Sequence, residues 1–301
     1  MTGEIRIGTR GSALALVQAR LAAVALERRG WLTRLAPIET DGDRRAPDTA
    51  WGEGAFVAAI ERALLDGRVD IAVHSAKDVP TDEDGRLLIG AYLPRADARD
   101  ALVLPGLTPG SLDELPAGTI VGTDSPRRTA FVLAQRPDLR VRPLHGNVDT
   151  RLRRLDAGEV DAAILACAGL DRLGHGMRIA ERIDPERMPP APGQGAIALQ
   201  VRRDDVTMQD IAAAVDDRPT RTAVEAERAL LRRAGGGCRS PIGAFAEVGD
   251  GRVRLLGGHA RPDGTGGRIG VRDGSLARMG EVVDALFRDL WTSTPVSEVS
   301  A

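Results

Sequence analysis

The fold class is indicated most clearly by Val69-Asp70-Ile71-Ala72-Val73-His74-Ser75-Ala76-Lys77-Asp78-Val79-Pro80. This stretch opens as a short, largely apolar run of the kind that forms a buried strand, and ionisable groups crowd the exit of that strand. Similar runs alternate with segments of helical period through the first two thirds of the chain, the pattern of βα units and a largely parallel sheet. The sequence therefore predicts an α/β fold, with strands at Glu4–Ile7, Thr33–Ile38, Val69–Val73, Leu87–Ala91, Ala101–Leu104, Thr119–Gly122, Leu139–Arg142, Ala162–Ala166 and Ala196–Val201.

Local signals place helices between and after these strands. Ser125 followed by Pro126 predicts a helix with an N-cap serine and proline at its first position, and Ser111–Glu114 matches the capping box that opens a helix. From Met208 onward the chain changes character, which predicts a small α+β domain. Its expected elements are helices at Met208–Val215 and Thr220–Ala234, a glycine turn at Gly235–Cys238, strands broken by glycines, and a last helix near Ser275–Trp291.

The length of 301 residues exceeds that of a usual single core, so two or three domains are expected. The Pro-Pro-Ala-Pro-Gly stretch that follows Met188 breaks the periodicity and predicts a crossing segment or hinge between two lobes. The segment Asp41–Gly54 is polar, contains glycine and proline and has no period, which predicts a mobile loop.

The charge balance limits the classes of partner. With 41 Lys+Arg against 43 Asp+Glu, the chain lacks the basic excess of most nucleic-acid binders, so no nucleic-acid partner is expected. Nearly all of the basic residues are arginine, which suits bidentate binding of carboxylates, although a GC-rich genome produces the same bias.

The cysteines and the apolar runs indicate the compartment. Cys167 and Cys238 lie far apart, so neither a disulfide framework nor a metal cluster is expected. No apolar run reaches membrane-spanning length, and the chain enters its first predicted strand without a charged and apolar leader. We therefore expect a cytoplasmic protein that has no membrane association and binds no metal.

Arginine recurs beside predicted helix N-termini. A cation at the positive end of the helix dipole is unfavourable by ~0.3–1 kcal/mol, so this placement calls for a compensating anion. Helix starts in an α/β domain follow the carboxyl ends of strands, where ligands of open sheets bind, so these arginines could converge on one crevice. They could equally pair with neighbouring Asp and Glu on a solvated face. The arginines are Arg10 ahead of Ser12, Arg127 and Arg128 after Ser125, and Arg151 after Asn147.

Asp78 and Lys77 stand just beyond the Val69–Val73 strand, a position that favours catalytic groups. An aspartate next to a lysine should stay ionised, able to stabilise a developing cation or to move a proton. The alternative is a turn-forming aspartate beside a surface lysine. The neighbouring His74 is expected to be structural.

Cys238 lies in Gly-Gly-Gly-Cys-Arg-Ser-Pro, an open and flexible loop after a helix rich in basic residues. Accessible thiols near positive charge ionise more easily, so Cys238 could be a nucleophile or the attachment point of a covalent cofactor. Cys167, in an apolar strand context, fits a buried free thiol better.

Six segments together resemble the porphobilinogen deaminase family, also called hydroxymethylbilane synthase, over nearly the whole chain. The resemblance implies two lobes like those of periplasmic binding proteins and a small α+β C-terminal domain. The expected division is residues 1–94 and 194–207 for the first lobe, 95–193 for the second lobe and 208–301 for the third domain. The segments are Gly8–Ser12, Asp70–Pro80, Gly122–Arg128, Gly146–Leu152, Pro192–Gly195 and Gly236–Cys238.

The resemblance also implies an activity. Members of the family condense four porphobilinogen units head to tail, with loss of ammonia, to give hydroxymethylbilane. The chain grows on a dipyrromethane cofactor bound through a thioether, and Cys238 matches the cysteine that carries it. Asp78 matches the catalytic aspartate, which stabilises a pyrrolic cation and moves a proton. The family is monomeric, and no metal is implied.

The matching positions also imply binding roles. Substrate carboxylates are expected to contact Arg10, Ser12, Arg151 and Arg172. The cofactor is expected to be held by Ser75, Lys77, Thr123, Asp124, Ser125, Arg127, Arg128, His145, Gly146 and Asn147.

Four positions depart from the family pattern. His145 replaces an arginine, Glu53 a lysine, Asp124 a serine and Ala76 a larger apolar residue. The cleft therefore loses two cations and gains two anions, which should make it less favourable for carboxylates. A diverged paralogue with altered substrate or chain length is thus an alternative, as is a non-catalytic solute-binding module on the same fold.

Overall fold

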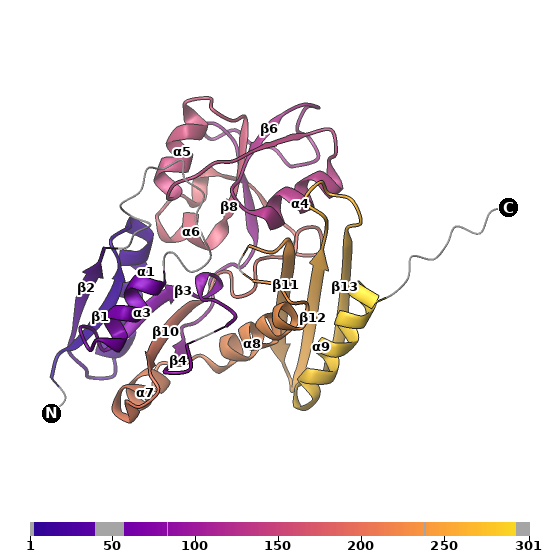
Figure 1. The fold of residues 1–301 in the computed structure, drawn as a ribbon. Helices are drawn as coiled ribbons and strands as arrows, with labels where there is room; N and C mark the ends of the chain where they lie inside the picture. The colour runs from indigo at the N-terminus through magenta and orange to yellow at the C-terminus, as the bar shows by residue number, and fades with distance from the viewer. Residues whose placement is uncertain (1–2, 40–56, 83, 238, 293–301) are drawn as a thin grey trace.

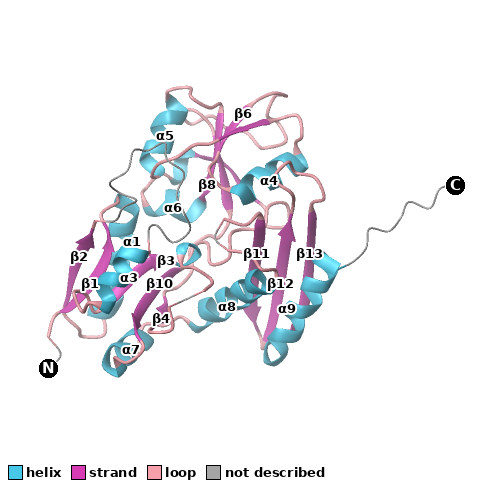
Figure 2. Cartoon of the chain, viewed as in Figure 1, coloured by secondary structure: helices cyan, strands magenta, loops and turns pink. Residues whose placement is uncertain are grey.

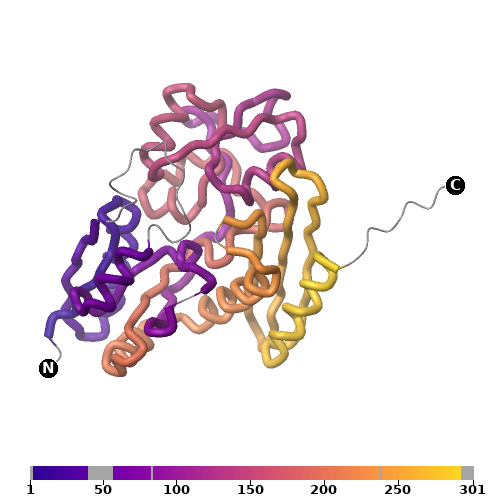
Figure 3. Tube along the Cα trace, viewed as in Figure 1, coloured from indigo at the N-terminus to yellow at the C-terminus, as the bar shows by residue number. Residues whose placement is uncertain are grey.

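The computed structural model describes residues 3–39, 57–82, 84–237 and 239–292. Its strands form three sheets, two of five strands and one of three. Figure 1 shows the two larger sheets in separate lobes, with the third sheet beside them. The chain passes between the two lobes twice, a path that can be followed in Figure 3. The fold is therefore α/β in two lobes, followed by a small α+β domain.

The first lobe contains a sheet with the strand order β2-β1-β3-β10-β4. Strands β1, β2 and β3 run parallel, whereas β10 is antiparallel to both of its neighbours. The chain enters β10 on its return from the second lobe, and so runs through the sheet in the opposite direction. The strands are Ile5–Arg10 (β1), Thr33–Ile38 (β2), Ile71–Ser75 (β3), Leu87–Tyr92 (β4) and Ile197–Arg202 (β10).

The second lobe repeats this arrangement in the order β7-β6-β8-β5-β9. Strands β6, β7 and β8 are parallel, and β5, which the chain enters on its outward crossing, is antiparallel to β8 and β9. The predicted parallel sheet is thus two mixed sheets, each with three parallel strands. The strands are Asp100–Val103 (β5), Ile120–Gly122 (β6), Arg140–Arg142 (β7), Ala162–Ala166 (β8) and Ile179–Ile183 (β9).

Helices cover the two sheets and bury apolar cores against them. Four of these helices begin at an N-cap whose side chain accepts a backbone N–H: Ser12 from Ala15, Ser125 from Arg128, Asn147 from Thr150 and Asp205 from Met208. The predicted Ser125–Pro126 helix start is therefore confirmed. The helices are Ala13–Glu27 (α1), Ala58–Leu65 (α3), Pro126–Gln135 (α4), Val148–Asp156 (α5), Cys167–Arg172 (α6) and Val206–Ala213 (α7).

In the third domain two helices lie along the sheet β11-β12-β13, as Figure 2 shows. Gly257 makes this packing possible, because a Cβ at that position would lie 2.5 Å from Leu230 of α8. The elements are Arg218–Arg233 (α8), Ile242–Gly249 (β11), Arg252–His259 (β12), Arg268–Ser275 (β13) and Met279–Phe287 (α9). Short helical turns elsewhere are Ala76–Asp78 (η1), Gly176–Arg178 (η2), Leu276–Arg278 (η3) and Arg288–Thr292 (η4).

One predicted helix start is wrong, and one strand was not predicted. The Ser111–Glu114 segment makes the side-chain half of a capping box, with Glu114 accepting the Ser111 backbone N–H at 2.8 Å, but it closes a single turn and no helix follows. Pro116 disfavours helical backbone at Leu115, which stops propagation. Strand β9 was not predicted, because its sequence Ile-Ala-Glu-Arg-Ile puts charged residues in its centre.

Helix α7 packs on β4 and β10, and its Ile211 and Ala212 belong to the core of the first lobe. The sequence division had assigned this helix to the third domain. We propose that the third domain starts after α7, because α8 is the first helix that packs on β11.

A buried carboxylate joins both interlobe crossings to the third domain. Glu227 of α8 is fully buried and pairs with Arg95, which lies on the outward crossing. It also accepts the backbone N–H of Gly193, on the return crossing, at 2.7 Å and that of Ala246, in β11, at 2.8 Å. One side chain therefore fixes three segments that are distant in sequence.

We predict that Glu227→Gln lowers the free energy of unfolding by about 3–5 kcal/mol, because it leaves the Arg95 charge buried without a counter-ion. Denaturant unfolding measures the change. Glu225→Gln is the matched control on the same helix: Glu225 is 49% exposed and contacts Arg221 at 3.4 Å, so its removal should cost less than about 1 kcal/mol. Equal losses in the two variants would contradict the assigned role of Glu227.

Candidate active site

The strand exit that carries Asp78 opens on a cavity of about 80 Å³. Asp78 ends η1, directly after β3, and β1 lies beside β3 in parallel. The carboxyl ends of the two strands therefore meet at one edge of the sheet. Arg10, Ser12 and Ser75 line the same cavity as Asp78, so the structure brings Arg10 to the crevice that the helix-start pattern predicted.

Two polar residues beside this cavity have structural partners. Ser75 and Gln18 are hydrogen-bonded, with the Gln18 amide donating to the Ser75 hydroxyl at 2.8 Å. His74 is buried, and its Nε2 lies 3.1 Å from Gln200 Oε1. Burial lowers the pKa of His74 to about 4, against a smaller opposing effect of Gln200, so the ring is neutral at pH 7. This environment agrees with the structural assignment of His74.

Lys77 is the only lysine in the sequence. Its ammonium donates to Gln194 Oε1 at 3.1 Å, and it lines a second, smaller cavity of about 30 Å³. Burial lowers the pKa of Lys77 to about 8, and the charge of Arg128 adds to this effect while that of Asp78 opposes it. An anion bound beside Lys77 would raise the pKa of its ammonium group again.

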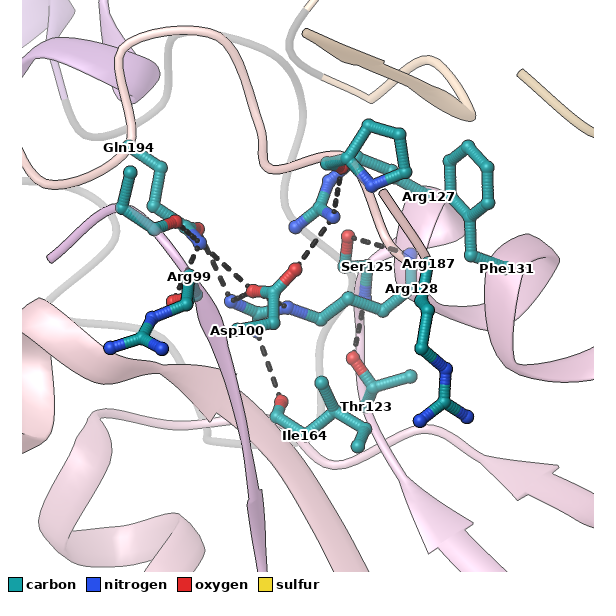
Figure 4. A network of polar contacts seen from close by, with 12 residues as sticks. Arg99, Asp100, Thr123, Ser125, Arg127, Arg128, Phe131, Ile164, Arg187 and Gln194 are labelled. Carbon is teal, nitrogen blue, oxygen red and sulfur yellow. Dashed lines mark hydrogen bonds and ion pairs between the residues drawn. The ribbon is translucent and has the colours of Figure 1, made fainter. Parts of the chain in front are cut away.

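The predicted arginine pair surrounds a buried carboxylate, Asp100, at the start of β5 (Figure 4). Arg127 Nη1 donates to Asp100 Oδ2 at 2.7 Å and Arg128 Nε to Oδ1 at 2.9 Å. Gln194 Nε2 donates to the same Oδ1 at 2.9 Å, and all four side chains are buried. We call Asp100, Arg127, Arg128 and Gln194 the Asp100 cluster. Asp100 is the anion that compensates the charges of Arg127 and Arg128. It belongs to the protein and is buried, so the two arginines do not pair with a carboxylate on a solvated face.

The charges of the Asp100 cluster do not cancel. Burial alone would raise the pKa of Asp100, but the charges of Arg127 and Arg128 outweigh it and hold that pKa well below its usual range. One carboxylate thus faces two guanidinium groups and the nearby Lys77. Among the described residues, the buried Nε of Arg127 has no hydrogen-bond partner. An anion entering the cavity beside Arg127 would meet uncompensated positive charge.

Arg151 brings a further cation, and its neighbours include two departures from the family pattern. Its Nε donates to Gly146 O at 2.7 Å. Burial lowers the pKa of Arg151 to about 10 and Arg128 adds to this, while Asp124 and Asp78 oppose it. The His145 ring lies 3.0 Å from Asp124 Oδ1. Asp124 therefore acts as an internal counter-ion in the region where a ligand carboxylate would bind.

The other predicted binding residues already have partners in the protein. Thr123 is buried and its hydroxyl accepts the Ser125 backbone N–H at 3.3 Å. Ser125 itself lines the cavity beside Lys77, and Asn147 is exposed with its side chain used as the cap of α5. Arg172 donates to Gly195 O at 2.7 Å, on the return crossing. Their roles toward a ligand stay predictions.

Cys238 lies outside the described residues, as do Asp41–Gly54 and Glu53 within it. The residues that flank position 238 are informative, because Gly237 and Ser240 line the same cavity as Lys77, Ser125 and Arg127. Ser240 Oγ accepts the Gly237 N–H at 2.8 Å, which closes the turn around this position. The third domain thus presents its glycine turn to the cationic region between the lobes.

Sequence reasoning missed Asp100 and gave Gln194 no role, although Gln194 lies in a quoted motif. Asp100 immediately precedes a run of apolar strand residues, and a carboxylate at the start of a buried strand requires a cationic partner. That signal was present in the sequence. The sequence did not show that Arg127 and Arg128 are the partners of Asp100, because that pairing depends on tertiary packing.

The fold and this region define a class: a two-lobed α/β protein with a buried cationic region between its lobes and a third domain that reaches it. Residues 5–210 match the model for "Porphobilinogen deaminase, dipyromethane cofactor binding domain", and residues 221–278 match that for the C-terminal domain of the same family. The chain belongs to the porphobilinogen deaminase family, so its cofactor is a dipyrromethane.

Relatives in mycobacteria carry the same family name. A porphobilinogen deaminase of Mycobacterium ulcerans (strain Agy99) is 50% identical over 81% of this chain and 77% of its own length. That of Mycobacterium tuberculosis (strain ATCC 25177 / H37Ra) is 48% identical over 83% and 82%. Among solved structures, the second substrate binding domain of a putative amino acid ABC transporter from Streptococcus pneumoniae Canada MDR_19A has a TM-score of 0.46 at 14% identity, covering 77% of this chain and 94% of that chain.

The described part of the chain contains no helix with the length and apolar character needed to span a membrane. It also contains no group of three or more His, Cys, Asp or Glu side chains placed to hold a metal ion.

We predict that Lys77 titrates near pH 8 in the unloaded protein. Carbon-13-labelled lysine gives a single NMR signal from this chain, whose midpoint in the Cys238→Ala variant should lie near 8, against about 10.4 in denaturant. The unfolded chain then holds the proton more tightly, so the free energy of unfolding should rise with pH between these values, and Lys77→Met should remove the rise. Asp78→Asn should lower the midpoint. A folded-state midpoint above 10 would contradict the buried cationic site.

Proposed function

We propose that this chain is a porphobilinogen deaminase, a transferase that joins four porphobilinogen units head to tail with loss of ammonia and releases hydroxymethylbilane. The observation that carries the proposal is the excess positive charge of the Asp100 cluster and Lys77, buried beside Asp78 and facing the flanks of position 238. Family membership supplies the reaction for which this arrangement is suited.

The buried cations match the charge of the substrate. Porphobilinogen carries an acetate and a propionate group, so a growing chain accumulates carboxylates that repel one another unless fixed cations neutralise them. Guanidinium groups bind carboxylates through two parallel N–H donors and keep their charge when buried. We assign this role to Arg10, Arg127, Arg128, Arg151 and Arg172, with Ser12 as a further hydrogen-bonding group.

Asp78 would act on the reacting ring. Loss of ammonia leaves a cation on the substrate pyrrole, and an ionised carboxylate can stabilise it through the pyrrole N–H. The same carboxylate can take up the proton that leaves the new ring junction. Lys77 and Arg151 both interact electrostatically with Asp78.

The residues around position 238 fit a dipyrromethane attached through Cys238. Its carboxylates would meet Lys77, Ser125 and Arg127, which line the cavity that Gly237 and Ser240 also border. Thr123, Asp124, Asn147, Ser75 and the His145–Gly146 pair are assigned to the wider binding region. When bound, the cofactor supplies a free pyrrole carbon to which substrate is joined.

We further propose a monomeric cytoplasmic enzyme without nucleic-acid partners. The balance of 41 basic against 43 acidic residues supports the last point, and the resemblance to the family supports the others.

We predict that Asp78→Asn lowers the rate of bilane formation from porphobilinogen by about 10²–10⁴-fold, because the variant lacks the carboxylate that stabilises the cation and accepts the proton. Intact mass should still show two pyrrole rings on the chain, and Cys238→Ala should lack them. Asp84→Asn is the control carboxylate, since Asp84 pairs with Arg86 at the surface. An unmodified wild-type chain that binds carboxylates without turnover would instead indicate a solute-binding module.

We predict that Asp124→Ser lowers KM for porphobilinogen roughly 3- to 10-fold, because it removes an internal counter-ion of Arg151 worth about 1 kcal/mol. His145→Arg should raise the rate by adding a cation at the same place. Asp149→Ser is the matched control, because Asp149 pairs with His175 in a more exposed aspartate–histidine contact of 2.9 Å. If the Asp124 and His145 variants behave like this control, the two departures do not weaken the cleft.

A further inference from the structure

Arg228 of α8 is buried directly behind the loop that carries Asp78. Its Nη1 donates to Val79 O at 2.8 Å and its Nη2 donates to Pro80 O at 2.6 Å. These are the first two carbonyl groups after Asp78 in the chain. One guanidinium therefore binds the backbone on which the position of the Asp78 carboxylate depends.

Two more contacts tie the same loop to the third domain. Val224, one helical turn before Arg228, packs in one apolar cluster with Ala76 and Val79. The Thr81 hydroxyl lies 3.5 Å from Gly236 O, in the glycine turn that precedes position 238. The loop from Ala76 to Thr81 is thus held from one side by α8 and by the turn that follows this helix.

The backbone carbonyl groups of the loop need hydrogen-bond donors, and the planar guanidinium of Arg228 suits them. Val79 has extended backbone, with φ −72° and ψ 123°, and Pro80 has no N–H, so the segment does not continue the hydrogen bonding of η1. Its carbonyl groups face the interior and require donors from elsewhere. A planar guanidinium offers two donors in a fixed fork, whereas a lysine ammonium offers a point charge on a flexible stem.

Arg228 also borders the cavity that Lys77 and Gly237 line. Helix α8 therefore determines where the Asp78 loop lies and, through its C-terminal end at Arg233, where the glycine turn of position 238 begins. A reaction between a group attached at position 238 and a carboxylate at position 78 depends on the distance between the two.

We propose that Arg228 is a positioning residue, which holds the backbone of the Asp78 loop in a fixed place relative to the glycine turn that carries Cys238. The proposal rests on the proposed function, because it takes Asp78 as the catalytic carboxylate and Cys238 as the site of cofactor attachment. It assigns Arg228 no contact with substrate. Both of its terminal nitrogens are engaged by Val79 O and Pro80 O. The alternative, that Arg228 binds a substrate carboxylate, predicts different kinetics.

The test compares Arg228→Met, Arg228→Lys and Arg221→Met in the cofactor-loaded enzyme. Arg228→Met should lower kcat about 30- to 100-fold with KM for porphobilinogen within twofold of wild type, the effect of a misplaced catalytic group. Arg228→Lys, which keeps one donor, should recover at least part of the loss. Arg221 is the matched control: it lies on the same helix and donates to Gly90 O in β4 at 2.8 Å, away from the loop. Its variant should keep kcat within twofold.

Three outcomes would overturn the proposal. A rise in KM with unchanged kcat, or a failure to acquire the two-ring adduct in the intact mass, would make Arg228 a ligand-binding residue. Wild-type kcat in Arg228→Met would leave it without any role in catalysis. If Arg228→Met does not fold, the kcat and KM of Arg228→Lys are compared with those of the wild type and interpreted in the same way. Absence of bilane formation by the wild-type chain would instead refute the proposed function.

Hydrogen exchange supplies a readout that does not depend on turnover. In Arg228→Met the amides of residues 76–79, 81 and 82 should exchange at least tenfold faster than in wild type, while those of β11 should be unchanged. Arg221→Met should leave the amides of residues 76–79 at the wild-type rate. Unchanged exchange of the loop in Arg228→Met would show that the guanidinium does not hold it.

Discussion

The site depends on one buried carboxylate. Without Asp100, two guanidinium groups and a nearby ammonium would lie together in the protein interior, and their repulsion and desolvation would not be offset. With a second carboxylate, the charges would cancel and little attraction for an anion would remain. A single Asp100 allows the cations to be buried before any ligand arrives, yet leaves them with positive charge in excess. Burial is the main cause of the lowered pKa of Lys77, and the charge of Arg128 adds to it.

The parts of the fold that follow from local rules could be predicted. Short apolar runs predicted the strands of both larger sheets except β9. Helix starts were expected beside Ser12, Ser125 and Asn147, of which Ser125 was predicted as an N-cap. Strand β9 could not be predicted in this way, because its central Glu181 and Arg182 are charged and are neutralised by distant partners: Arg182 pairs with Asp97 and Asp171. The direction of β5 and β10 follows from the interlobe crossings, which no local pattern encodes.

The candidate site also has one part that local sequence patterns predict and another that depends on long-range contacts. The residues around Asp78 share a strand edge, so their convergence follows from the α/β pattern and was predictable. The pairing of Arg127 and Arg128 with Asp100 is a long-range contact, and the sequence offered a solvated face and a ligand crevice as equal alternatives. The structure shows neither alternative in its simple form, because the anion that compensates Arg127 and Arg128 is Asp100, a buried side chain of the protein. The assignment of Cys238 to the cofactor rested on resemblance, since a cysteine in a glycine turn is compatible with several chemistries.

Gln194 makes the charge of the site depend on the arrangement of the lobes. Its Oε1 accepts from Lys77, in the first lobe, and lies 3.4 Å from Arg128 Nη2 in the second. Its Nε2 donates to Ala98 O and Asp100 on the outward crossing. The amide thus turns its negative end toward cations and its positive end toward acceptors. Gln194 therefore links Lys77 of the first lobe to Asp100 and Arg128 through one amide. Because the cations come from both lobes, their excess charge lies in one place only when the two lobes are packed as they are here.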